Sequence, residues 1–166
     1  WLDRSITRKK EIGALWPGSL FGIVQGNFYE DLRKRSADQI VSLDTPGIAI
    51  GGLSVGESFE TFSHFLAFTQ VLLPADKPRY LMGIGTPDYI LEAVENGIDL
   101  FDCVFPTRTA RNGQVFTKNG TINIKKERHA RDFAPIDESC PCSACTRYTK
   151  AYLRHLFKTG EISSGY

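Results

Sequence analysis

The sequence predicts an α/β fold built on a parallel sheet, because short apolar segments alternate with amphipathic ones from residue 19 to residue 106. The apolar segments are nearly continuous and end in Gly or polar residues, which is typical of strands buried on both faces. The segments between them place apolar residues at helical spacing. A regular alternation of strand and helix indicates that the strands pair in parallel.

Four strands are expected, at residues 19–26, 47–53, 79–85 and 98–106, with helices between them at 28–43, 58–73 and 86–97. The first of these helices has one apolar face opposite its charges, formed by Tyr29, Leu32, Ala37, Ile40 and Val41. The last has Thr86 as its N-cap, Pro87 at its first position and Gly97 at its end. Residues 1–15 read as a helix already under way, so we expect a segment of a longer chain.

Four parallel strands form either a small open sheet or half of a (β/α)8 barrel, and ligands collect at the carboxyl ends of the strands in both architectures. No phosphate-binding motif of the GxGxxG or GxxxxGK type follows the first strand, which favours the barrel. Half a barrel leaves two apolar strand edges unpaired. We therefore expect the missing strands to come from the rest of a longer chain.

The composition is that of an ordinary globular protein. The 166 residues are 42% hydrophobic and 23% charged, and the net charge is +1. This balance provides no overall field for nucleic acid, so such a partner would need a local basic cluster. No signal peptide and no apolar run long enough to span a membrane is visible, so we expect a soluble, cytoplasmic protein with no membrane partner.

The pattern changes after Pro106. Two Asn-Gly pairs, in "RNGQ" and "KNGT", flank segments of alternating polarity and predict a β-hairpin insertion. An amphipathic helix is expected at 147–160. Most of the basic residues gather in this part of the chain, and they form either a solvated face or phosphate contacts: Arg108, Arg111, Lys118, Lys125, Lys126, Arg128, Arg131, Arg147, Lys150 and Arg154.

Three of the four cysteines, Cys140, Cys142 and Cys145, crowd into "SCPCSAC". Residues so close together form disulfides with one another poorly, and a cytosolic setting disfavours such bonds. Thiolate ligands for zinc explain the spacing better. Cys103 lies far away in an apolar strand, where a small buried hydrophobe is the simplest interpretation.

Asp102 places a carboxylate inside the last apolar strand, between Phe101 and Cys103. A charge at such a position is paired, exposed at the end of the strand, or part of a reactive site. The residue pattern alone leaves a paired, hydrogen-bonded carboxylate and a catalytic one both open.

Several long motifs together resemble the tRNA-guanine transglycosylases, which exchange guanine at the anticodon wobble position for a queuosine precursor. They are "GIVQGN", "IGGLSVGE", "YLMGIG", "FDCVFPTRTARNGQVFT" and the CxCxxC cluster, in this order. The resemblance implies the second half of a (β/α)8 TIM barrel with a zinc-binding hairpin insertion. It assigns residues 1–106 to half of the barrel, 107–146 to the hairpin and zinc-binding insertion, and 147–166 to a C-terminal helix that returns to the barrel.

The resemblance also implies roles for single residues. Asp102 would be the nucleophile that forms a covalent link to ribose. Gln25 would bind the edge of the base, Gly52 and Leu53 would offer backbone groups, and Met82 would pack on the ring. Without the resemblance, Gln25 is equally a solvent-facing strand end and Met82 a core residue.

Glu57 would adjust the backbone of "LSV" for the aminomethyl group of preQ1, although an acid before a helix is also favoured by the helix dipole. Val55 in "GGLSVGE" is closer to the bacterial form, which takes preQ1. Arg108 and Arg111 would grip the anticodon loop of tRNA, or else are exposed hairpin charges.

The resemblance implies a structural Zn²⁺ on Cys140, Cys142 and Cys145, with a histidine beyond Tyr166 as the fourth ligand. His129 and His155 are candidates by residue type only, and neither is assigned. The general base and a second base-binding aspartate would lie before Trp1, so the segment alone is expected to be inactive, and the family implies a homodimer.

Three other interpretations stay open. An archaeal-type relative would insert a different deazaguanine elsewhere in tRNA. A noncatalytic partner subunit would have no need of the intact "FDCVFPTR". A zinc-stabilised RNA-binding module would perform no chemistry and would tolerate the loss of the Asp102 carboxylate.

Overall fold

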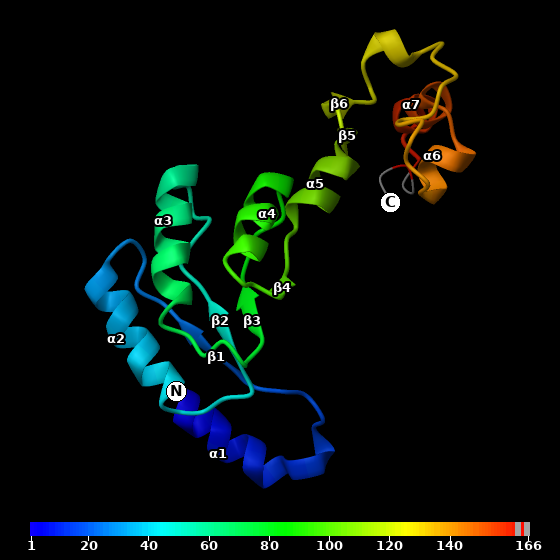
Figure 1. Ribbon diagram of the computed structural model, residues 1–166. Coiled ribbons are helices and arrows are strands. Elements are labelled where there is room, and N and C mark those ends of the chain that lie inside the picture. Colours follow the sequence, from blue (N-terminus) through cyan, green and yellow to red (C-terminus); the bar gives the residue numbers. More distant parts are fainter. Residues whose placement is uncertain (162–163, 165–166) are drawn as a thin grey trace. The chain divides into compact units, whose positions relative to one another are not determined.

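The computed structural model describes residues 1–161 and 164, in two compact units, Trp1–Cys103 and Val104–Tyr166. The first unit, coloured from blue to green in Figure 1, contains a parallel sheet with its helices. The second contains a hairpin, short helical turns and a terminal helix. No helix among the described residues has both the length and the apolar character needed to cross a membrane.

The sheet of the first unit confirms the predicted parallel α/β order. Its strands are β1 (Phe21–Val24), β2 (Gly47–Ile50), β3 (Arg79–Leu81) and β4 (Leu100–Phe101), and they lie in the order β1-β2-β3-β4. Every neighbouring pair is parallel. The last strand was predicted over residues 98–106 and is much shorter, because the chain leaves the sheet at Asp102 and a helix begins at Phe105.

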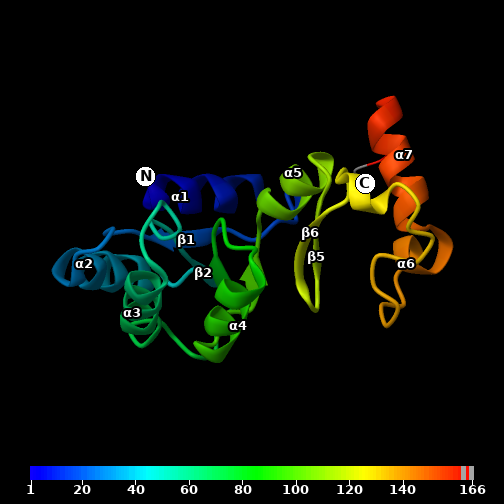
Figure 2. The same ribbon diagram turned by 90° about the horizontal axis from the view of Figure 1, so that it is seen from above.

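The first unit has four helices and one 3₁₀ turn. They are α1 (Leu2–Ile12), the 3₁₀ turn η1 (Gly13–Leu15), α2 (Glu30–Val41), α3 (Phe59–Gln70) and α4 (Pro87–Glu95). Helices α2, α3 and α4 connect the strands and cover one face of the sheet. Helix α3 packs against both α2 and α4. Figure 2 shows these three on one side of the strands and α1 apart from them, beyond β1.

The core lies between the sheet and helices α2 to α4. Val24, Ile48, Ile50 and Leu81 point into it from the strands and are almost fully buried. Burying such side chains stabilises the unit by about 1.5–3 kcal/mol each. Local signals set the helix ends: Ser58 caps α3 by accepting from the Thr61 N–H at 3.3 Å, and Pro87 opens α4.

The predicted apolar face of α2 is partly wrong. Ala37 is buried as expected, but Tyr29 and Leu32 are 60% and 46% exposed. Arg33 is completely buried instead. Its guanidinium finds enough carbonyl acceptors to replace water, so the helix turns this charged residue inward.

The opposite face of the sheet has a different composition. Ile23, Ala49, Tyr80 and Leu100 lie opposite one another in the parallel register, so they form a row across the four strands on this face. Ile23 and Leu100 are 40% and 46% exposed. Gln25, Met82 and Asp102 each follow the last residue of a strand, and by the alternation of side chains they project toward this same face.

The second unit contains α5 (Phe105–Arg111), β5 (Gln114–Thr117), β6 (Gly120–Asn123), the 3₁₀ turn η2 (Glu127–His129), α6 (Ser143–Arg147) and α7 (Lys150–Thr159). The antiparallel pairing of β5 with β6 confirms the predicted hairpin. The first Asn-Gly pair does not belong to it: Asn112 caps the end of α5, and Gly113 has a φ of +81°. A Gly that follows a helix and a Gly in a hairpin turn both use positive φ, so the sequence signal is the same.

Candidate functional site

The predicted site residues follow a single register row at the carboxyl edge of the sheet. Val24, Ile50, Leu81 and Phe101 lie opposite one another in the four strands. The next residues along the chain are Gln25, Gly51, Met82 and Asp102. Parallel strands end on the same edge, so this register brings Gln25, Met82 and Asp102 to one edge, as the sequence predicted.

Asp102 is exposed and held by two donors. The Tyr80 hydroxyl donates to Asp102 Oδ1 at 2.5 Å, and the Gly83 N–H donates to the same oxygen at 3.0 Å. Neither donor contacts Oδ2, and no ion pair with Asp102 occurs among the described residues. The carboxylate is therefore fixed through one oxygen, while the other remains available.

These hydrogen bonds also keep Asp102 ionised. The Tyr80 hydroxyl, and then the Gly83 N–H, lower the pKa of the Asp102 carboxyl from its ordinary value, against a small opposing effect of burial. The same contact raises the pKa of the Tyr80 phenol, which stays a donor at neutral pH. Near pH 7 the site thus presents an oriented anion.

Gln25 lies against the backbone at the end of β2. A Cβ atom at Gly51 would approach Gln25 Nε2 to 2.6 Å, and one at Gly52 would approach Gln25 Oε1 to 2.9 Å. The "GG" pair thus leaves room for the Gln25 amide. The edge combines the Gln25 side-chain amide with the peptide groups of Gly51 and Gly52, and an amide offers both a donor and an acceptor.

Glu57 organises the loop after β2. Its carboxylate accepts from the N–H groups of Ser54 and Val55, the latter at 2.7 Å. Ser54 has a φ of +60°, which is uncommon for a residue with a side chain. The "LSV" backbone is therefore shaped by Glu57, while Leu53 is buried and Met82 half-buried.

Sequence reasoning missed two residues of this edge. Tyr80 lies on β3, two residues before Met82. Side chains two residues apart on a strand point to the same face, so this alternation could have placed Tyr80 on the same side of the sheet as Met82. Arg33 precedes Ala37 by one helical turn, so it shares the buried face of α2. Charged residues are seldom buried, which concealed its role.

In the second unit, Arg108 and Arg111 are exposed on helix α5. The alternative interpretation of them as hairpin charges is wrong, because they lie on a helix that precedes the hairpin. They lie three residues apart, so they share one side of the helix and make a small basic surface.

Cys140, Cys142 and Cys145 form the one group of metal-binding side chains found among residues 1–161 and 164. Their sulfur atoms all lie within 4.8 Å of one another. The Cys145 N–H and the neighbouring thiols lower the pKa of Cys142 to about 7, whereas burial raises the pKa of Cys145. The trio fits a metal that takes thiolate ligands.

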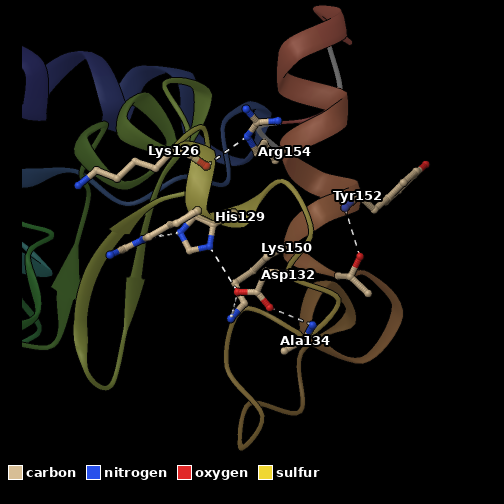
Figure 3. A network of polar contacts seen from close by, with 9 residues as sticks. Lys126, His129, Asp132, Ala134, Lys150, Tyr152 and Arg154 are labelled. Carbon is tan, nitrogen blue, oxygen red and sulfur yellow. Dashed lines mark hydrogen bonds and ion pairs between the residues drawn. The ribbon is translucent and has the colours of Figure 1, made fainter.

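Polar contacts close the loop that carries these cysteines (Figure 3). Asp132 before the loop pairs with Lys150 after it, with 2.8 Å between Asp132 Oδ2 and Lys150 Nζ. Two backbone hydrogen bonds reinforce this closure, from Lys150 N to Ala134 O at 2.9 Å and from Ala151 N to Asp132 O at 2.8 Å. We call Asp132, Ala134, Lys150 and Ala151 the loop clamp.

His129 belongs to this network and not to the cysteine trio. It is 6% exposed, and its Nε2 accepts from Arg128 Nε at 3.2 Å while its Nδ1 faces Asp132. Arg154 donates to Lys126 O at 3.2 Å and pairs with Glu127, which ties α7 to the η2 turn. His155 lies on α7 outside the metal group.

Comparison with known proteins identifies the family. A profile described as queuine tRNA-ribosyltransferase matches residues 1–165. The chain belongs to the queuine tRNA-ribosyltransferase family. Relatives with that name include one from Treponema denticola, 54% identical over 98% of this chain and 43% of its own length, and one from Bacillus subtilis, 58% identical over 97% of this chain and 42% of its own length.

A third family member, from Ruminiclostridium cellulolyticum, is 56% identical over 87% of this chain and 39% of its own length. The chain thus spans about two-fifths of the length of the queuine tRNA-ribosyltransferases that it matches. The match covers both units, so the Asp102 edge and the cysteine trio lie within the family's sequence.

Proposed function

We propose that the protein containing this chain is a pentosyltransferase that exchanges guanine at the anticodon wobble position of tRNA for preQ1, with Asp102 as the nucleophile. The observation that carries the proposal is the Asp102 carboxylate, ionised and fixed through Oδ1 at the edge that also carries Gln25 and Gly52. A free carboxylate oxygen beside amide groups suits attack on a sugar while a base is held.

In the proposed first step, Asp102 Oδ2 attacks ribose C1′ of a flipped-out guanosine and the bond from C1′ to guanine N9 breaks. The electron pair passes to guanine, which takes up a proton on leaving. The ribose is then joined to Asp102 as an ester. In the second step preQ1 loses its N9 proton, attacks C1′ and displaces the Asp102 carboxylate.

Base recognition is assigned to the edge of the sheet. The Gln25 amide and the backbone of Gly52 and Leu53 supply donors and acceptors, and Met82 offers an apolar surface for the ring. Glu57 accepts from the Ser54 and Val55 N–H groups, so it has the contacts needed to set the loop for an aminomethyl substituent.

The tRNA backbone is assigned to Arg108 and Arg111, because two exposed guanidinium groups one turn apart suit phosphate contacts. The resident metal is proposed to be a structural Zn²⁺ on Cys140, Cys142 and Cys145. It would cross-link the loop and helix α6, and a fourth ligand is needed to complete a tetrahedral site.

The architecture proposed for the whole protein is a (β/α)8 TIM barrel. The exposed apolar residues Ile23 and Leu100 on the sheet face opposite α2 to α4 support this, since that face would line the barrel interior. Residues 1–106 would form strands five to eight, 107–146 the inserted hairpin and metal loop, and 147–166 the returning helix, whose residues 162, 163, 165 and 166 lie outside the described ones. A cytoplasmic homodimer is proposed from the family resemblance.

The proposal is tested with a full-length enzyme that carries this sequence, cognate tRNA and labelled guanine. Incorporation of label into tRNA, and its release by preQ1, is the expected result. Binding of tRNA without any exchange of base would instead favour a zinc-stabilised RNA-binding module. Exchange outside the anticodon would favour the archaeal-type activity.

Replacing Tyr80 by phenylalanine is expected to move the acid limb of the kcat/KM profile to higher pH. The Tyr80 hydroxyl is the largest cause of the lowered pKa of Asp102, so without it the carboxylate becomes protonated, and activity is lost, earlier as pH falls. The measurement is exchange rate against pH. Tyr89→Phe is the control, because burial and not Asp102 is the main cause of the raised pKa of Tyr89. An unchanged acid limb in Tyr80→Phe would contradict this role.

Replacing Asp132 by asparagine is expected to loosen the cysteine loop without touching a ligand. The ion pair to Lys150 is lost, which destabilises the clamp by about 1 kcal/mol and weakens zinc binding roughly fivefold. Because Lys150 lowers the pKa of Asp132, the unaltered clamp is fully formed above the ordinary carboxyl pKa and opens as pH falls through the lowered one. Chelator competition measures zinc affinity, with Asp38→Asn in the exposed Lys34 pair as the control. Equal affinities in the two variants would sink the idea.

A further inference from the structure

Arg33 is a completely buried arginine below the carboxyl edge of the sheet. Its Nε donates to Asn27 O at 2.6 Å, and its Nη2 donates to both Gly51 O and Gly52 O at 3.2 Å. Nη1 reaches the Thr69 hydroxyl at 3.4 Å. Among the described residues it forms no ion pair. Backbone carbonyls accept from its guanidinium, and the nearby Glu57 carboxylate adds a favourable electrostatic interaction. One side chain thus joins the chain after β1 to the chain after β2.

The direction of the Gly51 and Gly52 carbonyls determines where the N–H groups of the same two peptides point. In a trans peptide the C=O and the N–H point in opposite directions, and no cis peptide occurs among the described residues. Because Gly51 O and Gly52 O point toward Arg33, the N–H groups of Gly52 and Leu53 point away from it. Neither N–H donates to another backbone group of the described chain.

Close packing makes this arrangement specific to the sequence. A Cβ atom at Gly26 would lie 2.6 Å from Arg33 N and 2.8 Å from Arg33 Cγ, so the helix approaches the strand end only because residue 26 is Gly. The Gln25 side chain then lies over Gly51 and Gly52. Arg33 therefore fixes the Gly51 and Gly52 peptide groups against which the Gln25 amide lies.

We propose that Arg33 is a positioning residue that turns the Gly52 and Leu53 N–H groups toward the 6-oxo group of a bound guanine-type base, and so sets selectivity for bases with an acceptor there. The inference rests on the proposed function and extends it to a residue that does not touch the base. Arginine is required because a planar fork reaches several carbonyls at once, whereas the point charge of a lysine does not.

The test compares guanine with 2-aminopurine, which has no 6-oxo group, in the full-length enzyme. For Arg33→Lys we expect the KM for labelled guanine to rise about tenfold, the effect of losing one well-formed hydrogen bond. The inhibition constant of 2-aminopurine against labelled guanine should stay within about twofold, since that base gains nothing from the oriented donors.

Arg79→Lys is the matched control. Arg79 is also buried and also binds carbonyls, those of Leu73 and Pro74, but it lies at the amino end of β3. We expect Arg79→Lys to lose about as much thermal stability as Arg33→Lys. The ratio of the KM for guanine to the inhibition constant of 2-aminopurine should stay that of the unaltered enzyme. Equal weakening of guanine and 2-aminopurine by Arg33→Lys, or the same change of ratio in Arg79→Lys, would overturn the proposal.

A second variant tests the inference if Arg33→Lys does not fold. Thr69→Val removes the hydroxyl that accepts from Arg33 Nη1 and donates to Phe65 O within its own helix, and it keeps the three backbone contacts of Arg33. It should raise the KM for guanine about threefold and leave the inhibition constant of 2-aminopurine unchanged. No change in the ratio of these two constants would count against the proposed role of Arg33. Failure of the unaltered enzyme to exchange guanine would instead refute the proposed function.

Discussion

Replacing Asp102 by asparagine is expected to lower kcat for guanine exchange by on the order of a thousandfold or more. The amide keeps the size of the side chain and still accepts from Tyr80 and Gly83 through its oxygen. It does not provide an anionic oxygen to attack ribose C1′, so no ester forms. The measurement is the rate at which labelled guanine enters tRNA, with tRNA binding followed in parallel.

Asp99 provides the control for this substitution. It lies three residues earlier on the chain, and its carboxylate accepts from the Arg79 N–H at 2.9 Å at the other end of the strand pair. Asp99→Asn keeps an acceptor there and should retain most of the exchange activity. If Asp102→Asn retained exchange to the same extent as Asp99→Asn, Asp102 would not be the nucleophile.

The second large effect is expected at the cysteine trio. Replacing Cys142 by serine removes one of three thiolates, and a hydroxyl is a poor ligand for a metal that prefers sulfur. We expect zinc affinity to fall at least about a hundredfold, because each Zn–S bond contributes several kcal/mol to binding. Since metal binding is coupled to folding, the loop between Asp132 and Lys150 should also become sensitive to protease.

Elemental analysis after purification and chelator competition measure this effect. Cys103→Ser is the control, because Cys103 lies outside the trio and the substitution should leave the zinc content unchanged. A full zinc content in Cys142→Ser would contradict the assignment of this residue as a ligand.

The parallel sheet and the edge that carries the site could be predicted because both follow from the repeated alternation of apolar and amphipathic segments. Four apolar segments end in Gly or polar residues, and parallel pairing brings those ends together. Gln25, Met82 and Asp102 could therefore be placed on one edge before any contact was known. The early end of β4 was not predictable, because the chain leaves the sheet where Asp102 accepts from the N–H of Gly83, which follows the neighbouring strand β3.

Contacts that depend on tertiary partners escaped prediction. Arg33 looks like a surface residue of α2 until the carbonyls of Asn27, Gly51 and Gly52 are seen around it. Helix α5 was missed because the Gly113 signal fits a hairpin turn as well as a helix end. The loop clamp links Asp132 to Lys150 across the whole cysteine loop, and no local pattern reports such a pair.

The most direct test of the account is to locate the covalent bond. The full-length enzyme is mixed with tRNA, quenched with denaturant in the absence of incoming base, and digested with nuclease and protease for mass spectrometry. We predict a ribosyl ester on the peptide that contains Asp102, and none in Asp102→Asn. An adduct on another residue, or exchange of guanine with no adduct at all, would contradict the role of Asp102 as nucleophile.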